Sequence, residues 1–147
     1  MKMDNRSLAV FALTNNLIDN DSPPLKASEF WPLLRSFPNV EDLLGLSENK
    51  IRELTPDSSI DARRLAQLLD TGIIQANQLT SLEDLGIAAI TASSDSYPQR
   101  IISRLGQSAP PILYVAGDVN LLRTDGIGVV GSRKVSESGF ELAQETA

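Results

Sequence analysis

The spacing of apolar residues changes near Gly86, and this change constrains the fold more than any other feature of the 147-residue chain. Before Gly86, apolar residues recur at helical spacing and are interrupted at short intervals by proline or glycine, which predicts several small helices. After Gly86, short β-branched runs alternate with helical segments, which is typical of an α/β arrangement. We therefore expect an α+β fold overall, with an all-helical domain over 1–82 and the first, incomplete part of an α/β domain over 83–147.

Two helices are predicted in the first forty residues. Apolar residues at helical spacing predict one helix over about 8–18, which a polar run before Pro23 should end. Ser28 is placed to cap the second helix, and Pro38 closes it. The aromatic side chains of this second helix have the spacing of a core face rather than of a base-stacking surface: Phe30, Trp31 and Phe37.

The rest of the helical half is expected to contain further short helices. Ser47 is a candidate N-cap, and a clear helical pattern covers 60–69, which Gly72 is expected to stop. Thr80 and Glu83 have the spacing of a capping box, which predicts a new helix start. We therefore expect a compact bundle of small helices.

The C-terminal half carries three apolar runs that predict strands, over 87–92, 112–116 and 127–130. A helix is expected to open at Tyr97-Pro98 between the first two, and Ser136 is placed to cap a helix after the third. The third strand, its glycine turn and this helix have the order of the opening of a nucleotide-binding-like α/β fold.

The chain stops at Ala147, about three turns into the last predicted helix. A doubly wound sheet needs on the order of a hundred further residues. We therefore expect a truncated form, a proteolytic fragment, or a protomer whose sheet is completed by another chain.

The composition excludes several classes of site. The chain has no cysteine and no histidine, which removes disulfides, Ser-His-Asp triads and zinc sites of the usual kind. No apolar run approaches 18 residues and no secretory signal is evident, which favours a cytoplasmic protein without a membrane span. Asp95 and Asp118 alone give weak support for a metal, and the adjacent Arg63 and Arg64 fit a solvated helix face.

The charge distribution argues against a protein that coats nucleic acid through bulk charge. The formal net charge is −6; residues 1–90 carry 8 basic and 13 acidic groups, and residues 91–147 carry 5 and 6. Any anion site must therefore be local and built from a few residues and backbone amides.

The best candidate for such a site is the turn Gly131-Ser132-Arg133, which follows the third predicted strand. Gly131 would let an anion approach the backbone, Ser132 offers a hydroxyl donor, and Arg133 offers a planar charged fork for phosphate. The free amides of the following helix would point to the same place. Lys134 is adjacent and basic. The turn is neither a Walker A loop nor a full dinucleotide fingerprint, so no cofactor is expected.

The wider pattern resembles the DNA-processing protein family DprA/Smf. It comprises Tyr97-Pro98, the proline-led run 110–117, the run 127–133, and Ser136 with Gly139 before a helix. The resemblance covers roughly 86–147 and is weaker over 1–85, where many members carry a small domain of sterile-alpha-motif or helix-hairpin-helix type. The run Leu44-Gly45-Leu46-Ser47 is compatible with such a hairpin.

The resemblance implies a function without catalysis. The family binds single-stranded DNA in a positively charged pocket of a Rossmann-like domain, protects incoming DNA in natural transformation (competence), helps to load the recombinase RecA, and works as a homodimer. Carried over by position, the phosphate-binding residues would be Gly131, Ser132 and Arg133, with Lys134 beside them, and there would be no catalytic or metal-binding residue.

Two other functions stay open from the residues alone. A nucleotide-processing enzyme of phosphoribohydrolase type also uses a glycine turn for phosphate, although such enzymes place their catalytic residues in later strands. The chain could also be a protein-interaction module whose helical domain binds a partner. Release of ribose from a nucleoside monophosphate would favour the enzyme, and capture of a partner by residues 1–82 would favour the module.

Overall fold

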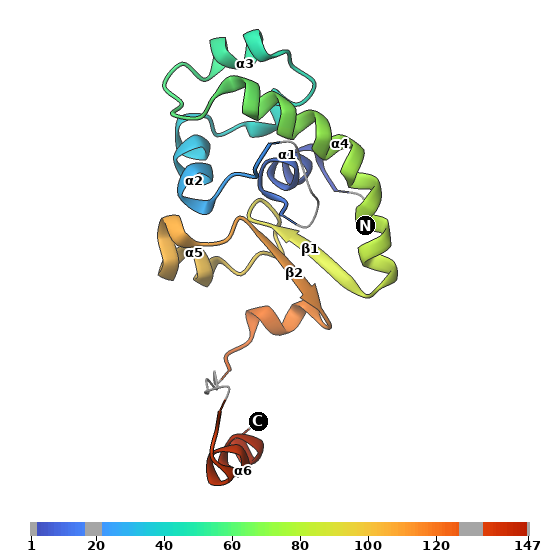
Figure 1. Ribbon diagram of the computed structural model, residues 1–147, viewed down its shortest axis with the longest axis vertical. Helices are drawn as coiled ribbons and strands as arrows, with labels where there is room; N and C mark the ends of the chain where they lie inside the picture. The colour runs from blue at the N-terminus through green and yellow to red at the C-terminus, as the bar shows by residue number, and fades with distance from the viewer. Residues whose placement is uncertain (1–2, 17–21, 127–133, 147) are drawn as a thin grey trace.

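The computed structural model describes residues 3–16, 22–126 and 134–146, and it has an α+β fold (Figure 1). Its elements, in chain order, are α1 (Asn5–Thr14), α2 (Ala27–Ser36), η1 (Val40–Leu43), α3 (Glu48–Leu54), α4 (Ala62–Asp84), β1 (Ile87–Thr91), α5 (Gln99–Leu105), η2 (Gly106–Ser108), β2 (Ile112–Ala116), η3 (Val119–Arg123) and α6 (Glu137–Thr146), where η marks a short 3-10 helix.

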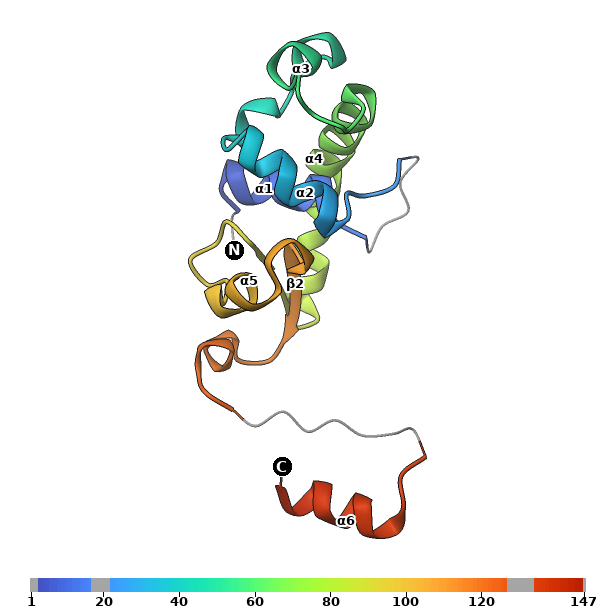
Figure 2. The same cartoon turned by 90° about the vertical axis from the view of Figure 1, so that its left-hand side faces the viewer.

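The first four helices form the predicted bundle, with α1 at its centre (Figures 1 and 2). Every residue of α1 from Ala9 to Thr14 is buried, because the run AVFALT has no charged side chain to keep in water. Phe30 is fully buried, and Trp31 and Phe37 pack against the same core, so their predicted core role is confirmed. The ring of Trp31 meets that of Phe30 edge to face at 5.3 Å.

Gly72 does not stop a helix, which corrects the sequence prediction. Helix α4 continues through this residue to Asp84. A Cβ added at Gly72 would lie 2.0 Å from the Cβ of Ala12 and 2.4 Å from its Cα, so the missing side chain is what lets α4 and α1 cross closely. An internal glycine in a helix marks a close crossing here rather than a boundary.

Three smaller predictions for the helical half also need correction. Thr80 and Glu83 lie near the C-terminal end of α4 and start no new helix. Lys26, not Ser28, is the N-cap of α2, and Glu29 accepts a hydrogen bond at 2.8 Å from the Lys26 backbone amide. Helix α1 ends at Thr14 rather than near residue 18. Ser47 is the N-cap of α3, as predicted.

Arg64 is not a solvated surface charge. Its guanidinium donates to both carboxylate oxygens of Glu29, at 2.7 and 3.2 Å, and to the carbonyls of Pro23 and Pro24, each at 3.0 Å. The hydrogen bond from Arg64 is the main reason that the pKa of Glu29 lies below its ordinary value. Arg64 therefore ties the start of α2 to α4, whereas Arg63 is exposed as expected.

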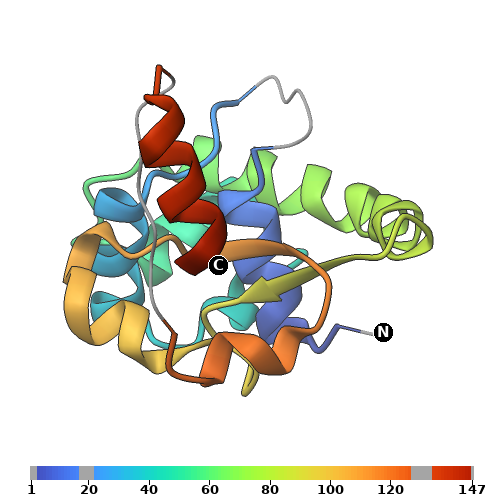
Figure 3. The same cartoon turned by 90° about the horizontal axis from the view of Figure 1, so that it is seen from below.

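The strands predicted near 87–92 and over 112–116 are confirmed as β1 and β2, which pair in antiparallel register with Ile87 opposite Ala116 and Thr91 opposite Ile112. A doubly wound sheet is mainly parallel, so this pair differs from the arrangement that the α/β pattern favoured. In Figure 3, α4 carries the chain out to one side, and β1 returns from its end toward α1. The third predicted strand lies outside the described residues.

The helical region and the strand pair share packing. Phe11 of α1 forms a second apolar cluster with Ala89 and Ile112. The Tyr114 hydroxyl donates to Asn15 Oδ1 at 2.7 Å, and burial raises the pKa of Tyr114 to about 12. Trp31 Nε1 donates to the Ala109 carbonyl at 2.8 Å. The predicted domain boundary after residue 82 falls near the end of α4, next to this shared packing.

Candidate nucleic-acid interface

The sequence places the candidate anion site in the turn between the third predicted strand and the last helix. Gly131, Ser132 and Arg133 lie outside the described residues. Lys134 is described and is exposed three residues before α6 begins. The structure describes the segments on both sides of the turn, up to residue 126 and from residue 134 onward.

On the downstream side, Ser136 caps α6, as predicted. The Gly139 amide donates to Ser136 Oγ at 3.3 Å, and the Phe140 amide donates to the Ser136 carbonyl at 2.9 Å. A Cβ on Gly139 would lie 2.8 Å from Val135 Cγ2 and 3.3 Å from Ser136 Oγ, so a larger residue there would require these side chains to shift. The start of a ten-residue helix, with its partial positive charge, therefore follows directly after the candidate turn.

The tyrosine and proline residues of the family pattern hold each other. Pro98 is the N-cap of α5, so the predicted helix start is confirmed. Tyr97 is only 2% exposed, and its hydroxyl donates to the Pro110 carbonyl at 2.6 Å. Burial raises the pKa of Tyr97 above its ordinary value. Tyr97 is thus a packing anchor that joins the start of α5 to the proline-led approach to β2, as the sequence suggested.

On the upstream side, two arginines hold η3 and the residues after it against α5. Arg100 Nη2 donates to the carbonyls of Leu122 and Thr124, at 2.9 and 2.7 Å, and Arg123 donates to the Asp95 carbonyl. A cavity of about 310 Å³ lies between α5 and η3, and its lining includes Asp95, Arg100, Leu122 and Arg123. Sequence reasoning missed both arginines, because their acceptors are main-chain carbonyls that leave no mark on residue type.

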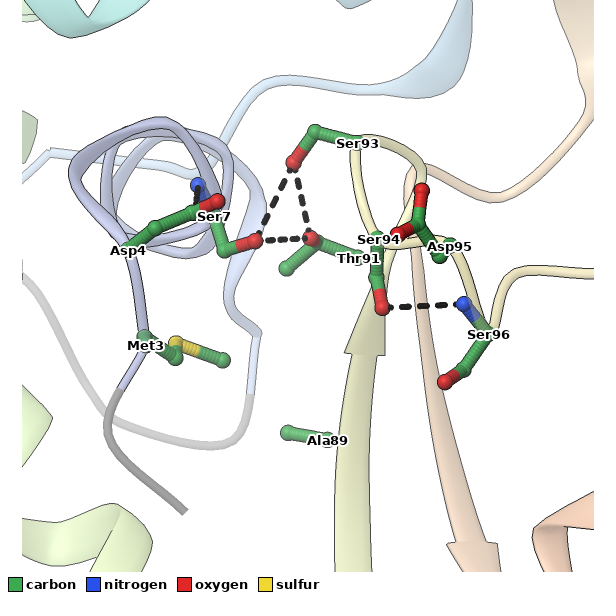
Figure 4. Close-up of a pocket in the computed structure, with 9 residues that line it drawn as sticks. All are labelled: Met3, Asp4, Ser7, Ala89, Thr91, Ser93, Ser94, Asp95 and Ser96. Carbon is green, nitrogen blue, oxygen red and sulfur yellow. Dashed lines mark hydrogen bonds between the residues drawn. The ribbon is translucent and has the colours of Figure 1, made fainter.

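A second cavity, of about 330 Å³, lies where α1 meets the end of β1 (Figure 4). The hydroxyls of Ser7, Thr91 and Ser93 are hydrogen-bonded to one another there. The oxygen–oxygen distances are 3.3 Å for Ser7 and Ser93, 3.1 Å for Thr91 and Ser7, and 3.0 Å for Thr91 and Ser93. The carboxyl-bearing residues Asp4 and Asp95 also line it, and none of its described lining residues is basic. The two carboxylates would repel a phosphate, so this cavity is a poor anion site. The hydroxyl bonds in it connect α1 to the end of β1.

Neither a metal-binding group of side chains nor a membrane-spanning helix is found among the described residues. Residues 3–16, 22–126 and 134–146 contain no group of three or more acidic, histidine or cysteine side chains that could hold a metal ion. None of the described helices is long and apolar enough to cross a bilayer. Asp95 and Asp118, the two acidic residues near strand ends, do not form such a group.

Comparison with known proteins finds one family whose model is similar to the C-terminal part of the chain. Residues 88–147 match the model of a protein family described as DNA recombination-mediator protein A. The resemblance drawn from the sequence is therefore confirmed over this segment, and the match supports a role in DNA processing and recombination. No curated protein and no solved structure matched the chain.

Proposed function

We propose, because residues 88–147 belong to the family of DNA recombination-mediator protein A, that the protein binds single-stranded DNA as an accessory factor of DNA uptake and recombination. In this proposal a backbone phosphate is held at the turn Gly131-Ser132-Arg133, with Lys134 beside it. The observation that carries the proposal is the match itself, since it spans the whole strand, turn and helix pattern in which these residues lie.

The described residues support this choice by elimination. Within the family pattern, the Tyr97 hydroxyl and the Pro110 carbonyl satisfy each other, and Gly139 serves the cap of α6. These residues of the pattern therefore have structural roles within the fold. The turn 131–134 is the part that combines a glycine, a hydroxyl and two positive charges next to a helix start, which is the composition that phosphate requires.

The charge of the chain sets the form of the interaction. With a net charge of −6, attraction of the whole molecule for DNA is weak, so binding must depend on a few local contacts. A phosphate contact carries no base information, so such a site accepts many sequences. We therefore propose binding that is tolerant of sequence and sensitive to salt.

The remaining features of the proposal follow from the family resemblance. The protein would act in the cytoplasm without catalysis, pass single strands to RecA in natural transformation, and work as a homodimer. Its C-terminal segment would be the start of a Rossmann-like domain, and its bundle would be a sterile-alpha-motif or helix-hairpin-helix unit.

The test is an equilibrium titration of the full-length protein with a fluorescent oligo(dT), followed by anisotropy at low salt. Arg133→Ala should weaken binding by a few-fold to about a hundredfold, on the scale of a charge-assisted hydrogen bond to phosphate. Arg63→Ala is the matched control, because Arg63 is an exposed arginine on α4, away from the turn in the chain. It removes the same charge and should leave the affinity unchanged.

Two outcomes would contradict the proposal. If Arg133→Ala binds oligo(dT) as tightly as the unaltered protein, the turn is not the phosphate site. If Arg133→Ala and Arg63→Ala weaken binding equally, attraction is a property of the total charge rather than of the turn.

A further inference from the structure

The segment 122–125 is fixed in space by a side chain from another element. Arg100 lies in the first turn of α5, two residues after Pro98. Its Nη2 atom donates to the Leu122 and Thr124 carbonyls, at 2.9 and 2.7 Å, and its Nη1 atom lies 3.6 Å from Asp125 Oδ1. One guanidinium thus contacts three residues within a four-residue stretch.

A second arginine makes the reverse connection. Arg123 belongs to the segment 122–125. Its guanidinium donates to the carbonyl of Asp95, which lies in the loop just before α5. The segment also has its own turn bonds: the Thr124 hydroxyl donates to the Leu121 carbonyl at 2.9 Å, and the Thr124 amide donates to the same carbonyl at 3.2 Å. The two arginines therefore fasten α5 and η3 to each other from both sides.

The segment that Arg100 contacts lies just before the predicted strand and the proposed anion turn. Asp125 is followed by Gly126 and then by the predicted strand 127–130 that leads into the anion turn. The direction in which the chain leaves η3 is set at Thr124 and Asp125, the residues that Arg100 contacts. A guanidinium can serve several acceptors at fixed angles, whereas a lysine ammonium on a flexible stem cannot reproduce this geometry.

We propose that Arg100 is a positioning residue for DNA binding: through the carbonyls of Leu122 and Thr124 it holds the residues that lead into the predicted strand 127–130 and the proposed phosphate-binding turn. This inference rests on the proposed function and deepens it by assigning a residue outside the turn. Arg100 touches no DNA in this account, and its effect passes entirely through the main chain of 122–125.

A positioning residue and a residue that contacts phosphate differ in their effect on the salt dependence of DNA affinity. Each phosphate contact adds about one unit to the slope of log affinity against log salt concentration, so losing a contact makes the slope shallower. Losing a positioning residue lowers the affinity while the number of phosphate contacts, and hence the slope, stays the same. A side chain that acted only as positive charge would also be replaced well by lysine.

The experiment measures oligo(dT) affinity across a salt series for four proteins: unaltered, Arg100→Ala, Arg100→Lys and Arg104→Ala. Arg104 is the matched control, since it is an exposed arginine one turn further along α5. We expect Arg100→Ala and Arg100→Lys to bind about fivefold more weakly than the unaltered protein with an unchanged slope, and Arg104→Ala to bind normally. Amide hydrogen exchange over 119–126, without DNA, should be faster in both Arg100 variants and normal in Arg104→Ala.

The results distinguish this inference from the proposed function. If Arg133→Ala weakens binding but Arg100→Ala does not, the site stands and the positioning role is overturned. A slope that falls by about one unit in Arg100→Ala would make Arg100 a direct phosphate contact, and full recovery in Arg100→Lys would make charge sufficient; either overturns the inference. If the unaltered protein does not bind oligo(dT), the proposed function and this inference both fail, whatever the exchange rates.

Discussion

The helical region and the segment that follows it are stabilised in different ways. The bundle buries one large apolar cluster that includes Val10, Leu13, Leu43, Leu65 and Leu68, all nearly fully buried. The strand segment has a much smaller cluster, and one of its three buried members, Phe11, belongs to α1. Hydrogen bonds also stabilise it, among them those from Trp31, Tyr97, Arg100 and Arg123 to main-chain carbonyls.

This difference shows which part of the molecule depends on the other. Apolar burial is the dominant favourable term in folding, so the bundle holds most of the stabilising free energy in the described structure. The segment that matches the family rests on the bundle through Phe11, Trp31 and Tyr114. The helical region therefore acts as a base on which the family-matched segment is built.

The largest expected effect comes from Phe11→Ala, which tests this dependence. Removing a ring that is 1% exposed should lower the free energy of unfolding by about 4 kcal/mol. Amide exchange should accelerate in β1 and β2, because the ring supports them directly. Leu13→Ala, in the bundle core, should instead speed exchange across both regions. If amide exchange in β1 and β2 were unchanged in Phe11→Ala, the strands would not depend on the bundle through this ring.

Gly72→Ala tests the close crossing of α1 and α4. The added Cβ would meet Ala12 at 2.0 Å and force the helices apart, which we expect to cost about 3 kcal/mol in urea unfolding. Gly126→Ala is the control, since a Cβ there meets no atom within 4 Å, and it should be close to neutral. A stable Gly72→Ala protein would mean that the bundle is packed more loosely than described.

Glu29→Gln tests the polar link within the bundle. The pair with Arg64 is partly buried, so the substitution should cost about 1 kcal/mol at neutral pH. Because the pKa of Glu29 is lowered in the folded state, this contribution is present above pH 4.5 and is lost as pH falls through the folded pKa. Glu53→Gln breaks the exposed pair with Lys50 and should be neutral. Equal effects of the two substitutions would contradict the account.

The smallest effect concerns the two tyrosines, both in the family-matched segment. Burial raises the pKa of Tyr97, and raises that of Tyr114 to about 12. Tyrosine absorbance in the folded protein should therefore titrate above pH 10, whereas in urea it should titrate near 10. Stability contributed by these hydroxyls is present below pH 10 and is lost as pH rises toward 12. A normal titration in the folded protein would show that this segment is not packed on the bundle.

Much of the fold could be predicted from local patterns. The two strands, the start of α5 at Tyr97-Pro98 and the cap at Ser136 all depend on neighbouring residues, and all are confirmed. Two of the predictions that failed depend on partners far along the chain. Gly72 meets Ala12, and Arg64 meets Glu29 35 residues away, and no short window contains both members of either pair.

The candidate site divides in the same way. Lys134, Ser136 and Gly139 could be identified because the turn, cap and helix are local in sequence. The supporting role of Arg100 could not, because its acceptors are main-chain carbonyls more than twenty residues away. The assignment of Gly131, Ser132 and Arg133 stays a prediction from the sequence and the family match.

The proposed function requires that the turn at 131–133 bind a phosphate of single-stranded DNA. The most direct measurement is the salt dependence of oligo(dT) affinity for the unaltered protein and for Arg133→Ala. The account predicts that the slope of log affinity against log salt becomes shallower by about one unit in Arg133→Ala. Two parallel lines of equal affinity would contradict it.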